Sequence, residues 1–206
     1  MAGIKRGDSV VVFGAGPVGL FAAKSAWFMG AGRVLVIDQY DYRLEFAQRF
    51  AQCETLNFRS IRDPVWYLKR LTDWLGWDAA IDAVGCEARG SAMQRGFGIR
   101  PAKVFGGSAV ALHWAIDAVR KGGVLSIVGA YGPIFNAVKI GDAMNKGLTL
   151  RMNQASVKRN LKRCSSTCRR GTSVRRTSSR IASRSRKWAR RTTSSPASST
   201  AASSRC

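Results

Sequence analysis

Apolar and polar positions alternate in blocks along the first 152 residues. Short, strand-length segments recur at Val10–Phe13, Val34–Ile37, Glu54–Phe58, Trp77–Val84, Val124–Val128 and Leu148–Met152. Between them, apolar residues fall at helical spacing in Val18–Met29, Arg43–Ala51, Val65–Leu75 and Ala109–Lys121. A helix-period block after a strand-period block predicts alternating strands and helices. Ser108 is a plausible start for the last helix, and Gly122 and Gly123 are expected to end it.

Strands that alternate with helices predict a parallel sheet with helices on both faces. Six strands predict the strand order 3-2-1-4-5-6 of an α/β, doubly wound Rossmann sheet. We place this domain at residues 1–160, because apolar periodicity fades after that point. Ligands of such sheets bind beyond the carboxyl ends of the strands, where the strand order reverses, so the segments that follow the first, fourth and fifth strands are expected to meet there.

A glycine-rich turn follows the first predicted strand and opens the first predicted helix. Its glycines are Gly14, Gly16 and Gly19, in the GxGxxG spacing that is typical of dinucleotide sites. Gly14 permits a tight turn, Gly16 lets a pyrophosphate approach the backbone, and Gly19 lets helix and strand pack closely. Pro17 suits a first helical turn, and the free N–H groups there, including that of Val18, attract phosphate.

Asp38 follows the second predicted strand, about 20 residues after the glycine motif, where a carboxylate accepts the ribose hydroxyls. The same carboxylate repels a 2′-phosphate, and Gln39 rather than Arg comes next, so NAD is favoured over NADP as the cofactor. Three other interpretations remain. They are an FAD site, a methyltransferase and a glycine turn that binds nothing. No second flavin motif is visible, and the six-strand layout disfavours a methyltransferase.

Composition and cysteine spacing limit where the protein is expected to be located and which kinds of site it is expected to contain. The chain has 206 residues, 46% of them hydrophobic, and a net charge of +22. No apolar run approaches the roughly 20 residues of a membrane span, and no signal-peptide core is visible, so a cytoplasmic location without membrane contact is expected. The cysteines show no metal-binding or disulfide spacing and are expected to be reduced thiols; they are Cys53, Cys86, Cys164, Cys168 and Cys206.

Several segments together resemble the coenzyme domain of medium-chain, zinc-type alcohol dehydrogenases, most closely the formaldehyde-dehydrogenase-like members. The segments are Lys5–Leu20, Asp78–Gly85, Ala118–Gly123, Val128–Gly129 and Met144–Leu148. This resemblance implies that Asp38 binds ribose and that Arg43 approaches the same sugar. It also implies nicotinamide-end backbone positions at Ala83, Val84, Val128 and Gly129.

The zinc chemistry of that family has no match in these residues. By the resemblance, the zinc ligands come from an N-terminal domain, and the zinc polarises the alcohol oxygen as hydride leaves. The single histidine, His113, lies within a predicted helix and is expected to be a packed or surface residue. We therefore expect no catalytic residue and no metal ligand here, and cofactor binding without useful turnover. Family members often pair through the last coenzyme-domain strand, here Leu148–Met152, so a homo-oligomer is also expected.

The last quarter of the chain differs sharply from the rest. From Lys158 onward there are fifteen of the 34 Lys and Arg residues and no Asp or Glu. Residues 161–206 are rich in Arg and Ser and are expected to be disordered, because they offer little apolar surface to bury. They predict non-specific binding to polyanions, and the alternative function is a nucleic-acid-binding arm.

A reading-frame slip explains this tail best. If each triplet from Cys164 is read one base earlier, suitable codons yield Leu-Phe-Glu-His-Val. Later stretches yield strings that end in Lys-Leu-Asp-Gly-Cys-Ile-Lys, which resemble the C-terminal segment of the dehydrogenase family. We therefore expect the tail to be an accident of the frame. Loss of the usual returning segment would then leave apolar surface uncovered and lower solubility.

Overall fold

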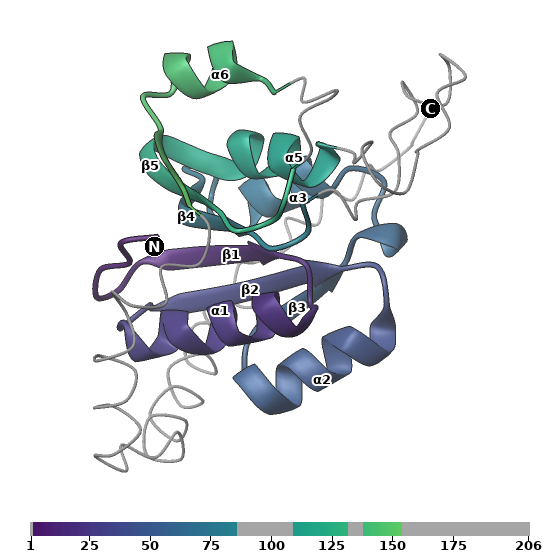
Figure 1. The fold of residues 1–206 in the computed structure, drawn as a ribbon. Coiled ribbons are helices and arrows are strands. Elements are labelled where there is room, and N and C mark those ends of the chain that lie inside the picture. The colour runs from purple at the N-terminus through teal and green to yellow at the C-terminus, as the bar shows by residue number, and fades with distance from the viewer. Residues whose placement is uncertain (1, 86–108, 132–137, 154–206) are drawn as a thin grey trace, which may run out of the picture. The chain divides into compact units, whose positions relative to one another are not determined.

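The computed structural model describes residues 2–85, 109–131 and 138–153 (Figure 1). These residues all lie in the first of the chain's two units, Met1–Ser165. The expected tail at 161–206 and the expected helix start at Ser108 lie outside the described residues.

Within the described residues, six strands form one parallel sheet. They are β1 Ser9–Phe13, β2 Arg33–Asp38, β3 Glu54–Asn57, β4 Trp77–Asp82, β5 Val119–Ile127 and β6 Thr149–Met152. Their order is β3-β2-β1-β4-β5-β6, which confirms the predicted Rossmann arrangement. The order reverses between β1 and β4, where Phe13 lies in register with Asp82.

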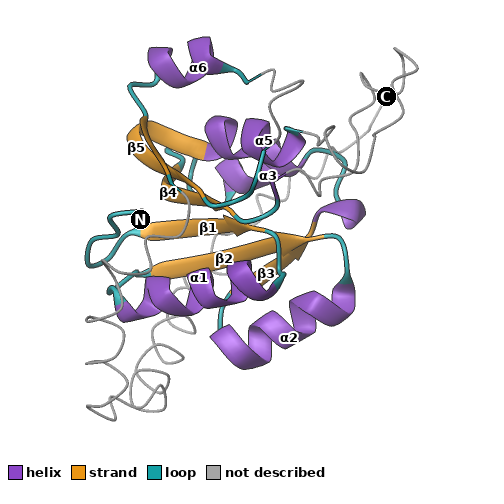
Figure 2. Ribbon diagram, viewed as in Figure 1, coloured by secondary structure: helices purple, strands orange, loops and turns teal. Residues whose placement is uncertain are grey.

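Helices cover both faces of the sheet (Figure 2). The helices are α1 Pro17–Phe28, α2 Asp41–Ala51, the 3-10 turn η1 Phe58–Ser60, α3 Pro64–Arg70, α5 Val110–Ala118 and α6 Ile140–Asn145. In Figure 2, α1 and α2 lie on one side of β1 and β2, and α3 and α5 lie on the other. None of the helices in the described part of the chain is long and apolar enough to cross a membrane.

The central strands are buried on both faces, which explains their unbroken apolar runs. Val10, Val11 and Val12 have no exposed surface. Alternate residues, Val11 and Phe13, join a core with apolar side chains of α3 and α5. Fully burying each such side chain contributes about 1.5–3 kcal/mol.

Two helix ends differ from the sequence prediction. Helix α3 ends at Arg70 rather than near Leu75, because Asp73 and Trp74 take left-handed backbone conformations. Helix α5 ends at Ala118, earlier than the predicted Lys121, because Val119 is extended and pairs with Trp77 of β4.

The predicted stop signal Gly122-Gly123 lies inside β5, in an irregular stretch where the register with β4 shifts. The end of α5 is secured instead by Lys146. Its ammonium donates to the carbonyl oxygens of Ile116, Asp117 and Val119 at 2.8, 2.9 and 3.0 Å. A cation at this end also complements the helix dipole.

Candidate functional site

The glycine turn after β1 requires two of its glycines on steric grounds. Gly14 has a φ of +96°, and a Cβ there would lie 2.8 Å from Cγ2 of Val84. A Cβ on Gly19 would lie 1.8 Å from the carbonyl oxygen of Gly14. Helix α1 can therefore begin directly against the end of β1 only if both positions lack a side chain.

Gly16 is different, because a Cβ there would meet nothing within 4 Å. The residue precedes α1, Pro17 occupies the first helical turn, and Val18 is 52% exposed. None of the described side chains caps this helix end, and its first turn holds no acidic residue. The first N–H groups of α1 therefore carry no side-chain cap from the described residues, and the space around Gly16 is open, which suits a phosphate at the positive end of the helix dipole.

Asp38 is the last residue of β2, and it is only 7% exposed. Its Oδ2 accepts the N–H of Ala15 at 2.6 Å, which ties the carboxylate to the glycine turn. Its Oδ1 accepts the N–H groups of Gln39 at 2.7 Å and Tyr40 at 3.1 Å. These three donors leave part of the acceptor capacity of a carboxylate, which is about four lone-pair sites, for a further hydroxyl.

Arg43 lies on α2 beside this carboxylate, with 3.9 Å between its NH1 nitrogen and Oδ2 of Asp38. Its Nε donates to the hydroxyl of Tyr42 at 3.0 Å, and the guanidinium lies 5.0 Å from the ring centre of Tyr40. The hydrogen bond to Tyr42 raises the pKa of Arg43, and the Asp38 carboxylate adds to the increase. The cation therefore stands next to the carboxylate at one end of the turn.

The loops after β4 and β5 lie at the same edge of the sheet. The N–H of Ala83 donates to the carbonyl of Phe13 at 3.0 Å, which joins the end of β4 to the end of β1. The N–H groups of Val128 and Gly129 both donate to the carbonyl of Asp82 at 2.9 Å, which joins the end of β5 to β4.

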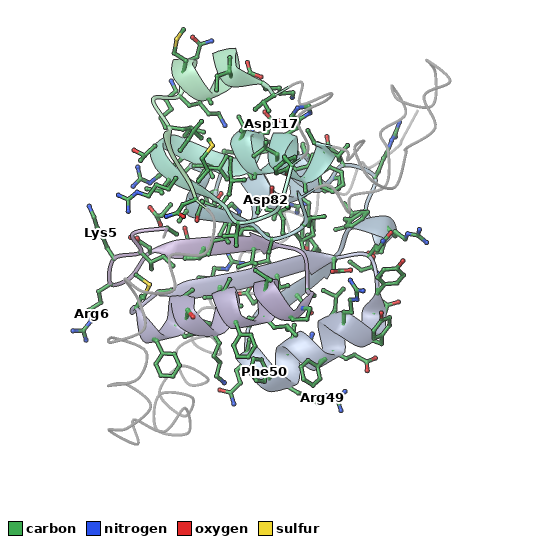
Figure 3. All side chains as sticks on the ribbon, in the orientation of Figure 1. Lys5, Arg6, Arg49, Phe50, Asp82 and Asp117 are labelled. Carbon is green, nitrogen blue, oxygen red and sulfur yellow. The ribbon has the colours of Figure 1, made fainter. Side chains whose placement is uncertain are left out.

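Asp82 is a residue that the sequence analysis did not single out. It ends β4, has no exposed surface, and its labelled side chain lies among the elements above β1 in Figure 3. Its Oδ1 accepts the N–H groups of Val84 at 3.0 Å and Gly85 at 3.3 Å, and its Oδ2 accepts the hydroxyl of Tyr131. The available signal was an acidic residue inside an apolar run, because a buried carboxylate needs several hydrogen-bond donors.

The sequence-predicted residues therefore meet at the carboxyl edge of β1, β2, β4 and β5, with Arg43 reaching it from α2. His113 does not belong to this group, since it lies half-buried in α5, within the helix predicted for it. Among the described residues, no group of three His, Cys, Asp or Glu side chains could hold a metal ion. Cys53 is buried as a free thiol, and burial raises its pKa to about 12.

Comparisons with known proteins point to one family, although no protein-family model matches the chain. It is 43% identical over 156 residues to the uncharacterized zinc-type alcohol dehydrogenase-like protein AdhB of Bacillus subtilis (strain 168). It is 37% identical over 150 residues to the glutathione-independent formaldehyde dehydrogenase of the same organism. These matches cover 76% and 73% of this chain, but only 40% and 34% of the relatives.

Solved structures that resemble this chain are alcohol dehydrogenases as well. The alcohol dehydrogenase TADH from Thermus sp. ATN1 matches with a TM-score of 0.61 and 28% identity, over 81% of this chain and 41% of that one. The benzyl alcohol dehydrogenase of Acinetobacter calcoaceticus matches with a TM-score of 0.61 and 25% identity, over 82% of this chain and 41% of that one. The chain thus spans less than half the length of the relatives that it matches.

Proposed function

We propose that this chain, which belongs over about three quarters of its length to the zinc-type alcohol dehydrogenase family, binds NAD at the carboxyl edge of its sheet. It would serve as the coenzyme-binding part of an alcohol dehydrogenase-like oxidoreductase. The bound nicotinamide ring supplies the hydride acceptor in such a reaction.

The observation that carries the proposal is the 2.6 Å hydrogen bond from the N–H of Ala15 to Oδ2 of Asp38. It places a buried carboxylate beside the turn in which the space around Gly16 is open. A pyrophosphate at the start of α1 would bring the adjoining adenosine ribose to Asp38, where the remaining lone pair can accept one of its hydroxyls.

The same arrangement supports NAD over NADP. A 2′-phosphate would meet the buried Asp38 carboxylate, and charge repulsion at such a site costs binding energy. Arg43 lies 3.9 Å from that carboxylate, so the negative charge of Asp38 partly offsets the attraction of Arg43 for a 2′-phosphate.

The proposal concerns the coenzyme and does not extend to the zinc ion of the family. The described residues offer no set of three side chains that could hold a metal, so no catalytic step is assigned to zinc here.

Calorimetric titration of the purified 206-residue chain with NAD and with NADP tests the proposal. The wild type is expected to bind NAD more tightly than NADP. Asp38→Asn should weaken NAD binding about 10–100-fold, because hydrogen bonds to a charged group contribute about 1.5–3 kcal/mol. It should weaken NADP much less, so the ratio of the two affinities falls.

Asp117→Asn is the matched control, since Asp117 also pairs with a cation, Lys139 at 2.9 Å, but on α5. It should leave both affinities within about twofold of the wild type. A wild type that binds no NAD, or an Asp38→Asn chain with unchanged NAD affinity, would refute the proposal.

Two further expectations remain part of this proposal. First, β6 is an edge strand whose Met152 is 61% exposed, and we propose that two copies pair through it. Sedimentation at several concentrations tests this, and Met152→Lys should shift the equilibrium toward the monomer, because lysine disfavours edge pairing.

Second, we propose that the basic residues from Lys158 onward bind polyanions without specificity. Their binding to heparin should fall steeply between about 50 and 200 mM salt, whereas NAD binding should change little. If the two salt dependences were equally steep, cofactor and polyanion would share one electrostatic site. A cytoplasmic location stays a prediction.

A further inference from the structure

The loops that follow β4 and β5 touch through their backbones. A Cβ on Gly85 would lie 2.5 Å from both the nitrogen and the oxygen of Ala130. A Cβ on Gly129 would lie 2.3 Å from the nitrogen of Gly85. Two glycines therefore face each other, and the separation of these loops is set at that contact and by the hydrogen bonds around it.

Asp82 makes hydrogen bonds to both loops from a fully buried position. Its Oδ1 holds the β4 loop through the N–H groups of Val84 and Gly85. Its own carbonyl holds the β5 loop through Val128 and Gly129. Its Oδ2 reaches farther along the β5 loop to the hydroxyl of Tyr131.

The hydroxyl of Tyr131 completes this network from a position four residues beyond the end of β5. Its partner lies 49 residues earlier in the chain, so the bond links two segments that no local turn connects. The ring of Tyr131 packs against the buried core, which fixes the direction from which the hydroxyl arrives. A segment that is held both by its backbone and by a side-chain hydroxyl can adopt fewer positions than one held at a single point.

We propose that the Asp82 carboxylate and the Tyr131 hydroxyl form a clasp that positions the β4 and β5 loops and thereby sets how tightly the nicotinamide end of NAD is held. This inference rests on the proposed function. Both are positioning residues, because they act through the backbone of Val84, Val128 and Gly129 rather than on the cofactor itself. The adenosine end is restrained by other contacts, which centre on Asp38 and Ala15.

Strand β4 carries a matched control at its opposite end. Asp78 accepts the N–H and the hydroxyl of Ser9 at 2.8 and 2.7 Å, so it too binds a backbone donor and a hydroxyl from another part of the chain. That pair lies at the amino edge of the sheet, away from the loops. Ser9→Ala and Tyr131→Phe therefore each remove one hydroxyl from a β4 carboxylate, at opposite edges.

The experiment compares the affinity for NAD with the affinity for ADP-ribose, which lacks only the nicotinamide. Calorimetry and thermal unfolding are applied to the wild type, Tyr131→Phe, Asp82→Asn and Ser9→Ala. Tyr131→Phe is expected to weaken NAD binding about fivefold and to leave ADP-ribose binding unchanged, which corresponds to one lost hydrogen bond.

Asp82→Asn is the conservative variant. Its side-chain oxygen can still accept from Val84 and Gly85, and its amide can donate to the oxygen of Tyr131, so the NAD to ADP-ribose ratio should stay within about twofold of the wild type. Ser9→Ala should lower the Tm without changing that ratio.

The outcomes separate the two claims. A wild type that binds neither ligand would remove the proposed function. A wild type that binds both equally well would show that the loops do not hold the nicotinamide, which overturns the clasp alone. The clasp is also overturned if Tyr131→Phe keeps the wild-type ratio, if it weakens both ligands equally, or if Asp82→Asn or Ser9→Ala lowers the ratio as much as Tyr131→Phe does.

Discussion

The two ends of β4 carry the same side chain in two different surroundings. At the amino end, the Asp78 side chain is 30% exposed and pairs with Arg120 at 2.7 Å. At the carboxyl end, Asp82 has no exposed surface, and the hydrogen bonds described for it come from neutral N–H and O–H groups. The first carboxylate joins β1, β4 and β5 where they begin, and the second shapes the loops where β4 and β5 end.

This difference follows from the fold. In a doubly wound sheet, ligands bind beyond the carboxyl ends of the strands, so only that edge must hold a defined concave backbone. The amino edge needs only stable connections, and a partly exposed ion pair is sufficient there. Similar hydrogen-bonding chemistry thus joins the strands at one edge and fixes the backbone of the candidate site at the other.

Glycines at the two edges give the largest contrast to test. Gly19→Ala at the carboxyl edge would bring a Cβ to 1.8 Å from the Gly14 carbonyl oxygen, which is part of the backbone and cannot move aside cheaply. Gly122→Ala at the amino edge meets only an arginine nitrogen at 3.8 Å, although its φ of +69° is strained for alanine. We expect losses of unfolding free energy of at least about 3 kcal/mol for the first and about 1 kcal/mol for the second.

Urea unfolding measures both losses, and titration with NAD reports on the site. Gly122→Ala should keep the wild-type affinity, whereas Gly19→Ala should lose binding wherever it still folds. If Gly19→Ala were as stable as Gly122→Ala, the close packing of α1 against the end of β1 would not be what this turn requires.

Much of this organisation could be predicted from the sequence. The apolar runs, the glycine spacing and the position of Asp38 are local signals, and the structure confirms the six strands and their order. It also brings Gly14 and Ala83 to one edge, because parallel strands end together once their order is known. The roles of these residues toward NAD stay predictions.

The sequence did not predict features whose local signal is weak or that depend on distant contacts. Helix α6 is short and contains Gly141, so its periodicity is too weak to detect. The irregular start of β5 arises because Val119 pairs with Trp77 while Val124 pairs with Ala79. The importance of Asp82 depends on Tyr131, and nothing near either residue in the sequence indicates that the two meet.

Lys146 provides the second test, at the amino edge. Lys146→Met removes hydrogen bonds to the carbonyls of Ile116 and Asp117 in α5 and of Val119 at the start of β5, and it removes the cation that complements the helix dipole. The free energy of unfolding should fall by about 2 kcal/mol, because partly buried carbonyl groups lose a charged donor. NAD affinity should stay within about twofold, since Lys146 lies away from the proposed site.

Lys139→Met is the control for that variant. Lys139 forms an ion pair with Asp117 on the surface, where such a pair contributes less than about 1 kcal/mol. Equal losses of stability for the two variants would mean that the carbonyl contacts of Lys146 contribute no more than a surface charge.

The smallest expected effect is the pH dependence of the Asp78 network. Burial alone would raise the pKa of Asp78, but hydrogen bonds from the Ser9 N–H, from Arg120 and from the Ser9 hydroxyl together lower it below the ordinary value of 3.8. A carboxylate whose pKa is lower in the folded state stabilises the protein above its unfolded pKa, and this contribution disappears as the pH falls through the folded pKa.

Asp78→Asn should therefore differ from the wild type by a constant unfolding free energy between about pH 5 and 7, and the difference should shrink below about pH 4. Urea unfolding at a series of pH values measures this directly, and Ser9→Ala should show a smaller pH-dependent part because one of the lowering hydrogen bonds is gone. A difference that stayed constant down to about pH 3 would show that Asp78 stabilises the amino edge by packing rather than as a carboxylate.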